Sequence, residues 1–370
     1  MDAAEGHAPT LPTGRRAVVH ALGASPQEAL EETLRIEVQP PPDPATLGPE
    51  DVVIRVRSAA VGWVDLLMTS GQYQHVPAPP YTPGLEYAGE VVWRGAAVRA
   101  PELGAKVLAD GLLTGPRSLG AYRAWGGFAT YAVAPAAAAL PLPAGLSFDE
   151  GACLLGGTET AYHALVTRGR VRAGETVLVL GASGSTGLAT VEVAKILGAT
   201  VIAAGRSAEK LEPARALGAD HLVVLGAPGA PRLRDAVKAL TGGRGADVVY
   251  DPVGGELSQE GLRAAAFGAR YLVVGWAATP LVARGGRDPN FIPTNLVLMK
   301  GLDVLGSPAA IAVLHDPALR TERLARALEW ARAGRLHPHV SHVFAFDELR
   351  QALRDKWEGR HAGNLVVHPD

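Results

Sequence analysis

The chain has 370 residues, of which 48% are hydrophobic, and a formal net charge of −2. This length is enough for two domains with separate cores, and a near-neutral charge without a basic stripe argues against a nucleic-acid-binding surface. The single cysteine, Cys153, excludes an internal disulfide and most cysteine-based metal sites.

Residues 1–14 are small, polar and proline-containing, with neither a basic n-region nor an apolar h-region. We therefore expect a frayed tail and no secretory signal. No apolar run reaches the roughly 18 residues of a membrane span; even the alanine-rich stretch 132–146 is interrupted by prolines. These features, together with the single cysteine, predict a cytoplasmic protein.

The first part of the chain, up to about Leu146, predicts a small β-rich domain. Short apolar alternations separated by glycine and proline are typical of strands in such a domain. The expected strands are 51–58, 87–93, 106–109 and 127–133.

The second part predicts a doubly wound parallel sheet. Residues 148–168 are expected to form a connecting helical segment, and from Thr176 short buried strands alternate with helix-length segments. The expected strands are 177–180, 201–204, 221–225, 248–251, 271–275 and 304–306. A helix at 321–333 follows, and the return 342–367 is too short for a domain of its own. We predict one domain over 148–334, and a second over 1–147 completed by 335–370.

A glycine turn at the start of the sheet predicts dinucleotide binding. Glycines 181, 184 and 187 lie between a strand and a helix, with GxxGxxG spacing. Such a turn lets backbone approach a pyrophosphate, and the next helix begins with unpaired N–H groups and a positive dipole end. Glycine turns also occur for structural reasons alone, but the flanking strand and helix favour binding. The expected contacts are Gly181, Ala182, Ser183, Gly184, Ser185, Thr186 and Gly187.

The end of the second strand favours NADPH over NADH. An NAD site normally has an acidic residue there, whereas this chain has Gly205, Arg206 and Ser207, followed by Lys210. A guanidinium pairs with a 2′-phosphate through two hydrogen bonds, and an ammonium adds charge. The alternative is that both cations are solvated charges at a helix start, where cations without an anion are mildly unfavourable.

Several motifs together resemble the medium-chain dehydrogenase/reductase superfamily, in its zinc-free quinone oxidoreductase and enoyl reductase branch. The resemblance spans residues 52–367 and implies an α/β fold: a Rossmann doubly wound parallel sheet plus a GroES-like β-rich substrate domain. It also implies a nicotinamide cofactor bound between the two. The motifs are PGLEYAGEV at 83–91, GGFATYAV at 126–133, TAYHAL at 160–165, LGASGSTG at 180–187, LGADHLV at 217–223, DVVYDPVGG at 247–255 and IPTNLVLMKGLDVLG at 292–306.

The resemblance predicts no metal site. Zinc alcohol dehydrogenases carry Gly-His-Glu where this chain has Gly84, Leu85 and Glu86, and a four-cysteine lobe that this chain lacks. Without those ligands a tetrahedral zinc site is not expected. The near-neighbours His337, His339 and His342 have no carboxylate or cysteine at ligand spacing, so we expect them at the surface. Simple alcohol oxidation is therefore not favoured.

The segment 60–73, AVGWVDLLMTSGQY, holds the catalytic candidates. In the resembling enzymes it begins with an asparagine beside the nicotinamide, continues to an aspartate and ends in Gly-x-Tyr, whose phenol is a proposed proton donor. Here Asp65 and Tyr73 match, while Gly62 replaces the asparagine and leaves a substrate-binding position without its amide. Leu67 stands where the resembling quinone reductases can have a tyrosine, so Tyr73 is the main phenol of this segment. The alternatives are that Tyr73 packs beside prolines and that Asp65 is structural.

The resemblance assigns further cofactor contacts to strand ends at the carboxyl edge of the sheet and to the preceding helix. Trp276 is also a candidate wall of the substrate pocket, or else an interface or core aromatic. Asn364 takes a place that is often lysine in the family. The assigned residues are Thr160, Asp251, Val253, Val274, Gly275, Trp276 and Asn364.

The predicted function is NADPH-dependent reduction of quinones or of activated C=C bonds in small conjugated carbonyl compounds. One alternative is an enoyl thioester reductase of a biosynthetic pathway, which would need cationic residues at the cleft mouth to accept a coenzyme A substrate. Another alternative is a non-catalytic NADPH-binding protein. We also expect a homodimer, because residues 302–306 end the sheet with an unpaired apolar edge. The candidate cations are Arg117, Arg123, Arg284 and Arg287.

Overall fold

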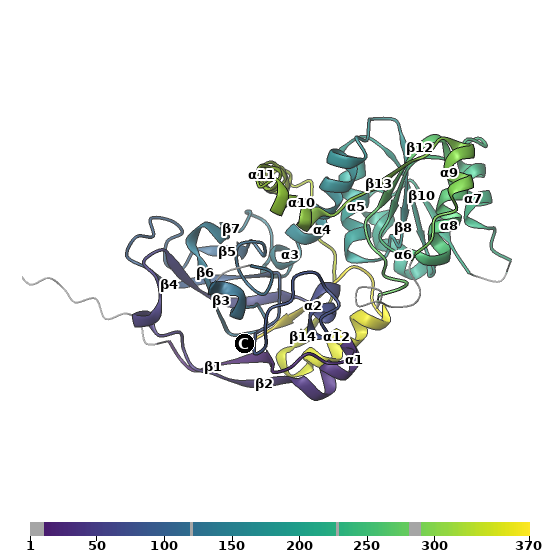
Figure 1. The fold of residues 1–370 in the computed structure, drawn as a ribbon. Coiled ribbons are helices and arrows are strands. Elements are labelled where there is room, and N and C mark those ends of the chain that lie inside the picture. Colours follow the sequence, from purple (N-terminus) through teal and green to yellow (C-terminus); the bar gives the residue numbers. More distant parts are fainter. Residues whose placement is uncertain (1–10, 119–120, 227–228, 281–289) are drawn as a thin grey trace, which may run out of the picture. The chain divides into compact units, whose positions relative to one another are not determined.

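The computed structural model describes residues 11–118, 121–226, 229–280 and 290–370, so Arg284, Arg287 and most of the expected tail lie outside the described residues. The chain divides into two compact units, coloured along the sequence in Figure 1. The first comprises Met1–Ala152, His342–Glu358 and Leu365–Asp370, and the second Cys153–Ser341 and Gly359–Asn364.

The first unit is built on antiparallel strands. A two-stranded sheet pairs β1 (Gly14–Val19) with β2 (Leu34–Gln39), and a larger sheet has the order β14-β15-β3-β4-β5-β7, with β6 also paired to β3. The strands of the larger sheet are β3 (Asp51–Ala60), β4 (Tyr87–Arg94), β5 (Lys106–Ala109), β6 (Tyr131–Pro135), β7 (Ala139–Pro141), β14 (Val340–Ala345) and β15 (Asn364–His368). Its helices are α1 (Pro26–Glu28), α2 (Trp63–Thr69), α3 (Phe148–Ala152) and α12 (Leu349–Glu358).

The central strand of the first unit, β3, follows from its alternating sequence. Val52, Ile54 and Val56 are fully buried in the core of this unit, as expected for every second side chain of a strand. The C-terminal return completes the sheet, since β15 pairs antiparallel with β3 and Val366 lies opposite Ala60.

The second unit has the predicted doubly wound parallel sheet, with strand order β10-β9-β8-β11-β12-β13. The first strand of this unit, β8, therefore lies beside its fourth strand, β11, and this is the point where the winding reverses. The strands are β8 (Thr176–Leu180), β9 (Thr200–Gly205), β10 (His221–Val224), β11 (Ala246–Asp251), β12 (Ala265–Val273) and β13 (Asp303–Gly306). The helices are α4 (Leu155–Tyr162), α5 (Ser185–Ile196), α6 (Ala208–Ala216), α7 (Leu233–Leu240), α8 (Gly255–Ala264), α9 (Thr294–Lys300), α10 (Ala309–His315) and α11 (Ala318–Arg332).

The connecting segment 148–168 is helical, as expected, and divides into α3, α4 and a π-helical turn at His163–Arg168; glycines weaken the helix around the break. One expected strand is wrong in its limits. The expected strand 127–133 begins only at Tyr131. A Cβ on Gly127 would lie 2.7 Å from the Cβ of Tyr87, so the backbone there packs too closely for an ordinary strand.

Candidate functional site

The glycine turn joins β8 to α5, and Gly184 is the N-cap of the helix. Gly181 has a φ of +61° and a Cβ there would lie 2.8 Å from the Val253 side chain, while a Cβ on Gly187 would lie 2.5 Å from the carbonyl oxygen of Gly181. Both positions therefore require glycine. At Gly184 a Cβ would meet nothing closer than 3.4 Å, so this position leaves open space at the start of the helix. A narrow turn with open space at a helix N-terminus fits a pyrophosphate.

The turn is held in place by the chain just before β15. Gly363 donates its N–H to the Ser183 carbonyl at 2.8 Å and accepts from the Ser185 hydroxyl at 2.8 Å. Asn364 donates both its backbone N–H and its side-chain amide to the carbonyl of His339, at 3.0 and 3.1 Å. Ser185 and Asn364 are therefore brought together, and their side chains bond to backbone.

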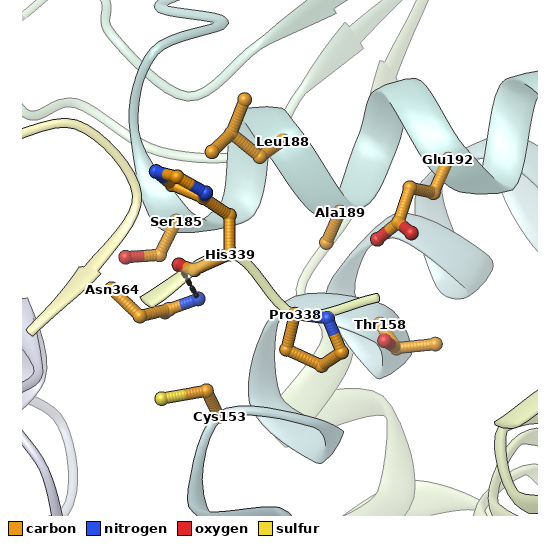
Figure 2. Close-up of a pocket in the computed structure, with 9 residues that line it drawn as sticks. All are labelled: Cys153, Thr158, Ser185, Leu188, Ala189, Glu192, Pro338, His339 and Asn364. Carbon is orange, nitrogen blue, oxygen red and sulfur yellow. Dashed lines mark hydrogen bonds between the residues drawn. The ribbon is translucent and has the colours of Figure 1, made fainter. Parts of the chain in front are cut away.

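Figure 2 shows a pocket against the first turns of α5. It includes two predicted cofactor residues, Ser185 and Asn364, and adds the acidic Glu192, which is 6% exposed. Burial raises the pKa of Glu192, while a 2.6 Å hydrogen bond from the His337 N–H opposes the rise. The sequence reasoning missed these neighbours, although the spacing of 185, 188, 189 and 192 on one helix face indicates them. The pocket is lined by Cys153, Thr158, Ser185, Leu188, Ala189, Glu192, Pro338, His339 and Asn364.

The end of β9 presents cations. Arg206 is exposed and forms no hydrogen bond or ion pair with any residue in the described part of the chain. Ser207 is the N-cap of α6 and accepts from the Lys210 N–H at 3.3 Å, while the Lys210 ammonium donates to the Gly359 carbonyl at 2.7 Å. Arg360 follows Gly359 in the sequence and is a third cation. The sequence analysis missed the contact between Lys210 and Gly359 because 149 positions separate these two residues.

The carboxyl ends of β8, β11 and β12 also converge. The Asp251 carbonyl accepts the N–H groups of Val274 and Gly275 at 2.8 and 3.3 Å. The Asp251 carboxylate accepts four more bonds, from the Val253 and Gly254 N–H groups and from the Ser258 and Tyr271 hydroxyls. Asp251 therefore shapes this loop, because its oxygens are already engaged by the protein.

Two other predicted cofactor contacts are Thr160 and Trp276. Thr160 lies on α4 and donates its hydroxyl to the Gly156 carbonyl at 2.7 Å, within its own helix. Trp276 is 41% exposed, which argues against a role as a core aromatic of the second unit.

In the first unit, Asp65 is 2% exposed and binds backbone. Its carboxylate accepts from the N–H of Gly62 at 3.0 Å, of Gly84 at 3.0 Å and of Leu85 at 3.1 Å. Burial raises the pKa of Asp65 to about 7, although these hydrogen bonds lower it in part. A Cβ on Gly62 would lie 2.7 Å from the carboxylate. The glycine at this position is therefore matched to Asp65, and the pair ties α2 to the 84–85 backbone.

Tyr73 lies in the first unit after α2 and is partly buried. Its ring is tilted by 56° against that of His75, with centroids 5.9 Å apart. No hydrogen bond joins its hydroxyl to the residues that the structure describes, so the phenol is available to a ligand.

Comparison with known proteins assigns the family. A model of the alcohol dehydrogenase GroES-like domain matches residues 48–144, and a model of zinc-binding dehydrogenases matches 185–312. Quinone oxidoreductase-like protein 2 homolog of Nematostella vectensis is 33% identical over 324 residues, covering 87% of this chain and 82% of that protein. The chain belongs to the medium-chain dehydrogenase/reductase superfamily, in its quinone oxidoreductase branch. Quinone oxidoreductase-like protein 2 of Mus musculus is 31% identical, covering 88% and 86%.

Solved structures of other oxidoreductases share the fold. A probable oxidoreductase from Mycobacterium abscessus is 29% identical, with a TM-score of 0.77 over 97% of this chain and 99% of that one. Escherichia coli quinone oxidoreductase, solved with NADPH, is 22% identical, with a TM-score of 0.75 over 96% and 100%. The recognition from sequence and the predicted fold class are therefore confirmed, and the chain is an oxidoreductase of this superfamily.

A family model named for zinc raises the question whether this member's residues fit that metal. Leu85, at the position of the zinc-binding histidine, is a buried apolar side chain. Within the described ranges, no group of three or more His, Cys, Asp or Glu side chains is arranged to hold a metal ion. The three near-neighbour histidines make separate contacts: His337 with Glu192, His339 with Asn364 and His342 with Phe344. The donor set does not fit zinc.

In the described part of this oxidoreductase, none of the helices has the length and apolar character needed to cross a membrane.

Proposed function

We propose that the protein is an NADPH-dependent oxidoreductase that reduces quinones or activated C=C bonds of small conjugated carbonyl compounds, without zinc. The observation that carries the cofactor is Arg206, an exposed guanidinium at the end of β9 that has no partner among the described residues. A 2′-phosphate is the anion that a dinucleotide brings to this strand end. Lys210, held at the carbonyl of Gly359, adds positive charge.

The glycine turn supports the same proposal. Gly181 and Gly187 leave no room for a side chain, and the start of α5 offers N–H groups to a pyrophosphate. NADPH, when bound, supplies the hydride.

The remaining chemistry needs a proton. Reduction of a conjugated bond leaves the electron pair on the carbonyl oxygen as an enolate, whose α carbon must then be protonated. We assign that proton to the hydroxyl of Tyr73, which regains it from solvent. Asp65 acts as a positioning residue, because it holds the start of α2 to the 84–85 backbone.

A screen of cofactor oxidation tests the proposal. The purified chain is mixed with NADPH or NADH and with a quinone, an enone or an enoyl thioester, before and after treatment with a chelator. We expect turnover of at least one acceptor, a preference for NADPH, and the same rate after chelation. Tight NADPH binding without turnover of any acceptor would indicate the non-catalytic alternative, and activity lost together with zinc would contradict the metal-free part.

A further inference from the structure

Three polar side chains of the first unit, Tyr73, His75 and Arg117, form no hydrogen bond or ion pair with any residue in the described ranges. The Tyr73 and His75 rings are 5.9 Å apart. The Nδ1 of His75 and the Nε of Arg117 are both buried and make no hydrogen bond. Burial lowers the pKa of His75, and the nearby positive charge of Arg117 lowers it further, so His75 is neutral at pH 7. We call these three residues the Arg117 cluster.

Buried polar atoms without partners are uncommon, and each one calls for an explanation. Burial raises the pKa of Asp65, and the positive charge of Arg117 opposes this rise. The Asp65 carboxylate, however, accepts hydrogen bonds from three backbone N–H groups and not from Arg117. Arg117 forms no ion pair with any residue in the described ranges. The adjacent Gln72, 7% exposed, likewise has a buried Oε1 without a partner. Buried polar atoms without hydrogen-bond partners therefore occur at Gln72 and His75, before and after Tyr73 in the sequence. They indicate a site where a ligand supplies the missing hydrogen bonds.

The surroundings of Arg117 leave space for that ligand. One terminal nitrogen of its guanidinium lies 4.0 Å from the Cβ that a side chain at Gly111 would have. Position 111 cannot accept such a side chain, because the same Cβ would lie 2.4 Å from the Leu85 carbonyl oxygen. The glycine therefore keeps this side of the guanidinium clear.

We propose that the Arg117 cluster binds a carboxylate carried by the substrate close to its conjugated double bond, so that the preferred substrates are conjugated keto acids. The proposal rests on the proposed function. A guanidinium binds a carboxylate through two parallel, charge-assisted hydrogen bonds, and an N–H of His75 is a further donor. Because Tyr73 is the assigned proton donor, an anion held here lies near the reacting carbons. The phosphates of a coenzyme A thioester lie far from its double bond and do not meet this condition.

A matched pair of substrates tests the proposal. 4-Oxo-2-pentenoate and 3-penten-2-one share one enone and differ by a carboxylate in place of a methyl group. We expect wild type to favour the keto acid in kcat/KM, and Arg117→Ala to lower kcat/KM for the keto acid at least about tenfold, with less than a threefold change for 3-penten-2-one. Arg117→Lys should restore part of the loss. Arg99→Ala is the matched control, since Arg99 is an exposed arginine of the same unit.

A binding measurement separates this proposal from the proposed function. Calorimetry with 4-oxopentanoate, which has no double bond to reduce, should show binding to wild type in the presence of NADPH and weakening of at least about tenfold in Arg117→Ala. If no quinone, enone or enoyl thioester is reduced but this difference is seen, the proposed function fails and the carboxylate site stands. Equal losses for both enones would assign Arg117 to the carbonyl oxygen and overturn the proposal. A loss confined to enoyl-CoA, absent with a short thioester, would assign it to phosphates and overturn it too.

Discussion

Arg206 is the residue on which we propose that the choice of cofactor depends, since it is an exposed cation with no partner among the described residues. Removing the Arg206 guanidinium should remove one charge-assisted hydrogen bond to NADPH and weaken the binding free energy of NADPH by about 1.5–3 kcal/mol. We therefore expect Arg206→Ala to raise the Kd of NADPH about 10- to 150-fold and to leave that of NADH nearly unchanged. Arg215→Ala is the control, because Arg215 is exposed on α6, the helix that follows Arg206, and pairs with Glu212. An NADPH affinity within twofold of wild type in Arg206→Ala would make the assignment wrong.

Tyr73 is the residue that we propose as the proton donor in the reduction of enones. A positioned acid contributes about 10²- to 10⁴-fold, so Tyr73→Phe should lower kcat for 3-penten-2-one at least about tenfold, with NADPH affinity unchanged. Quinones should be far less sensitive, because water can protonate the reduced oxygen anions. Stopped-flow measurement of NADPH oxidation with both acceptors makes the comparison. Small and equal effects would mean that Tyr73 only packs and that solvent supplies the proton.

His163 makes stability depend on pH. It is 2% exposed, neither ring nitrogen has a hydrogen-bond partner, and burial lowers its pKa from 6.5 to about 4. The unfolded chain therefore binds this proton first, so the free energy of unfolding falls as pH drops from 6.5 towards 4, by up to about 1.4 kcal/mol per pH unit. Urea unfolding at pH 7 and pH 5 should show a smaller acid loss in His163→Leu. The exposed His315→Gln should keep the full loss; equal losses in all three proteins would contradict this role.

At the scale of elements, the contact between α2 and the 84–85 backbone depends on Asp65. Asp65→Ala leaves three N–H groups without an acceptor, so we expect the free energy of unfolding to fall by about 3 kcal/mol or more. Because the pKa of Asp65 is raised from 3.8 to about 7, its contribution is largest below 3.8 and declines as pH rises through 7.

The difference between wild type and Asp65→Ala should therefore be larger at pH 5 than at pH 8, as measured by denaturant unfolding. The control is Asp43→Ala, since Asp43 is exposed and its carboxylate accepts a single backbone N–H, that of Ala45, at 3.0 Å. If the difference in unfolding free energy between wild type and Asp65→Ala grew from pH 5 to pH 8, the predicted direction of the pH dependence would be wrong.

Sequence alone predicts the elements whose signals are local. The β8 turn and α5 follow from a buried apolar run and three glycines, and the structure has β8 directly before the turn and α5 beginning at Ser185 within it. It does not predict contacts between distant segments, such as Gly363 with Ser183 or Lys210 with Gly359. Nor does it predict that the Asp251 and Asn364 side chains bond within the protein, because spacing does not reveal which acceptors are already occupied.

At the scale of the whole molecule, we keep the prediction of a homodimer formed through the edge of the parallel sheet. The last strand, β13, pairs only with β12 among the described strands. Nearby, Leu298 and Met299 on α9 are 80% and 74% exposed, and Phe267 on β12 is 83% exposed. Exposed apolar side chains beside an open edge are typical of an interface.

Sedimentation at micromolar concentration should give twice the 38.4 kDa of one chain. Leu298→Glu should shift the mass towards the monomer, whereas Val38→Glu, at an exposed position of β2, should not. A wild-type mass of one chain would make the prediction wrong.

The path of the chain has a consequence for protein engineering and for evolution by recombination. The polypeptide passes from one unit to the other after Ala152, Ser341, Glu358 and Asn364, and the short insert Gly359–Asn364 includes the residues that hold the glycine turn. No single crossover with a related gene exchanges one unit intact. A chimera that takes its first unit from a relative keeps this chain's bracing of the glycine turn only if residues 359–364 of this chain are retained as a separate cassette.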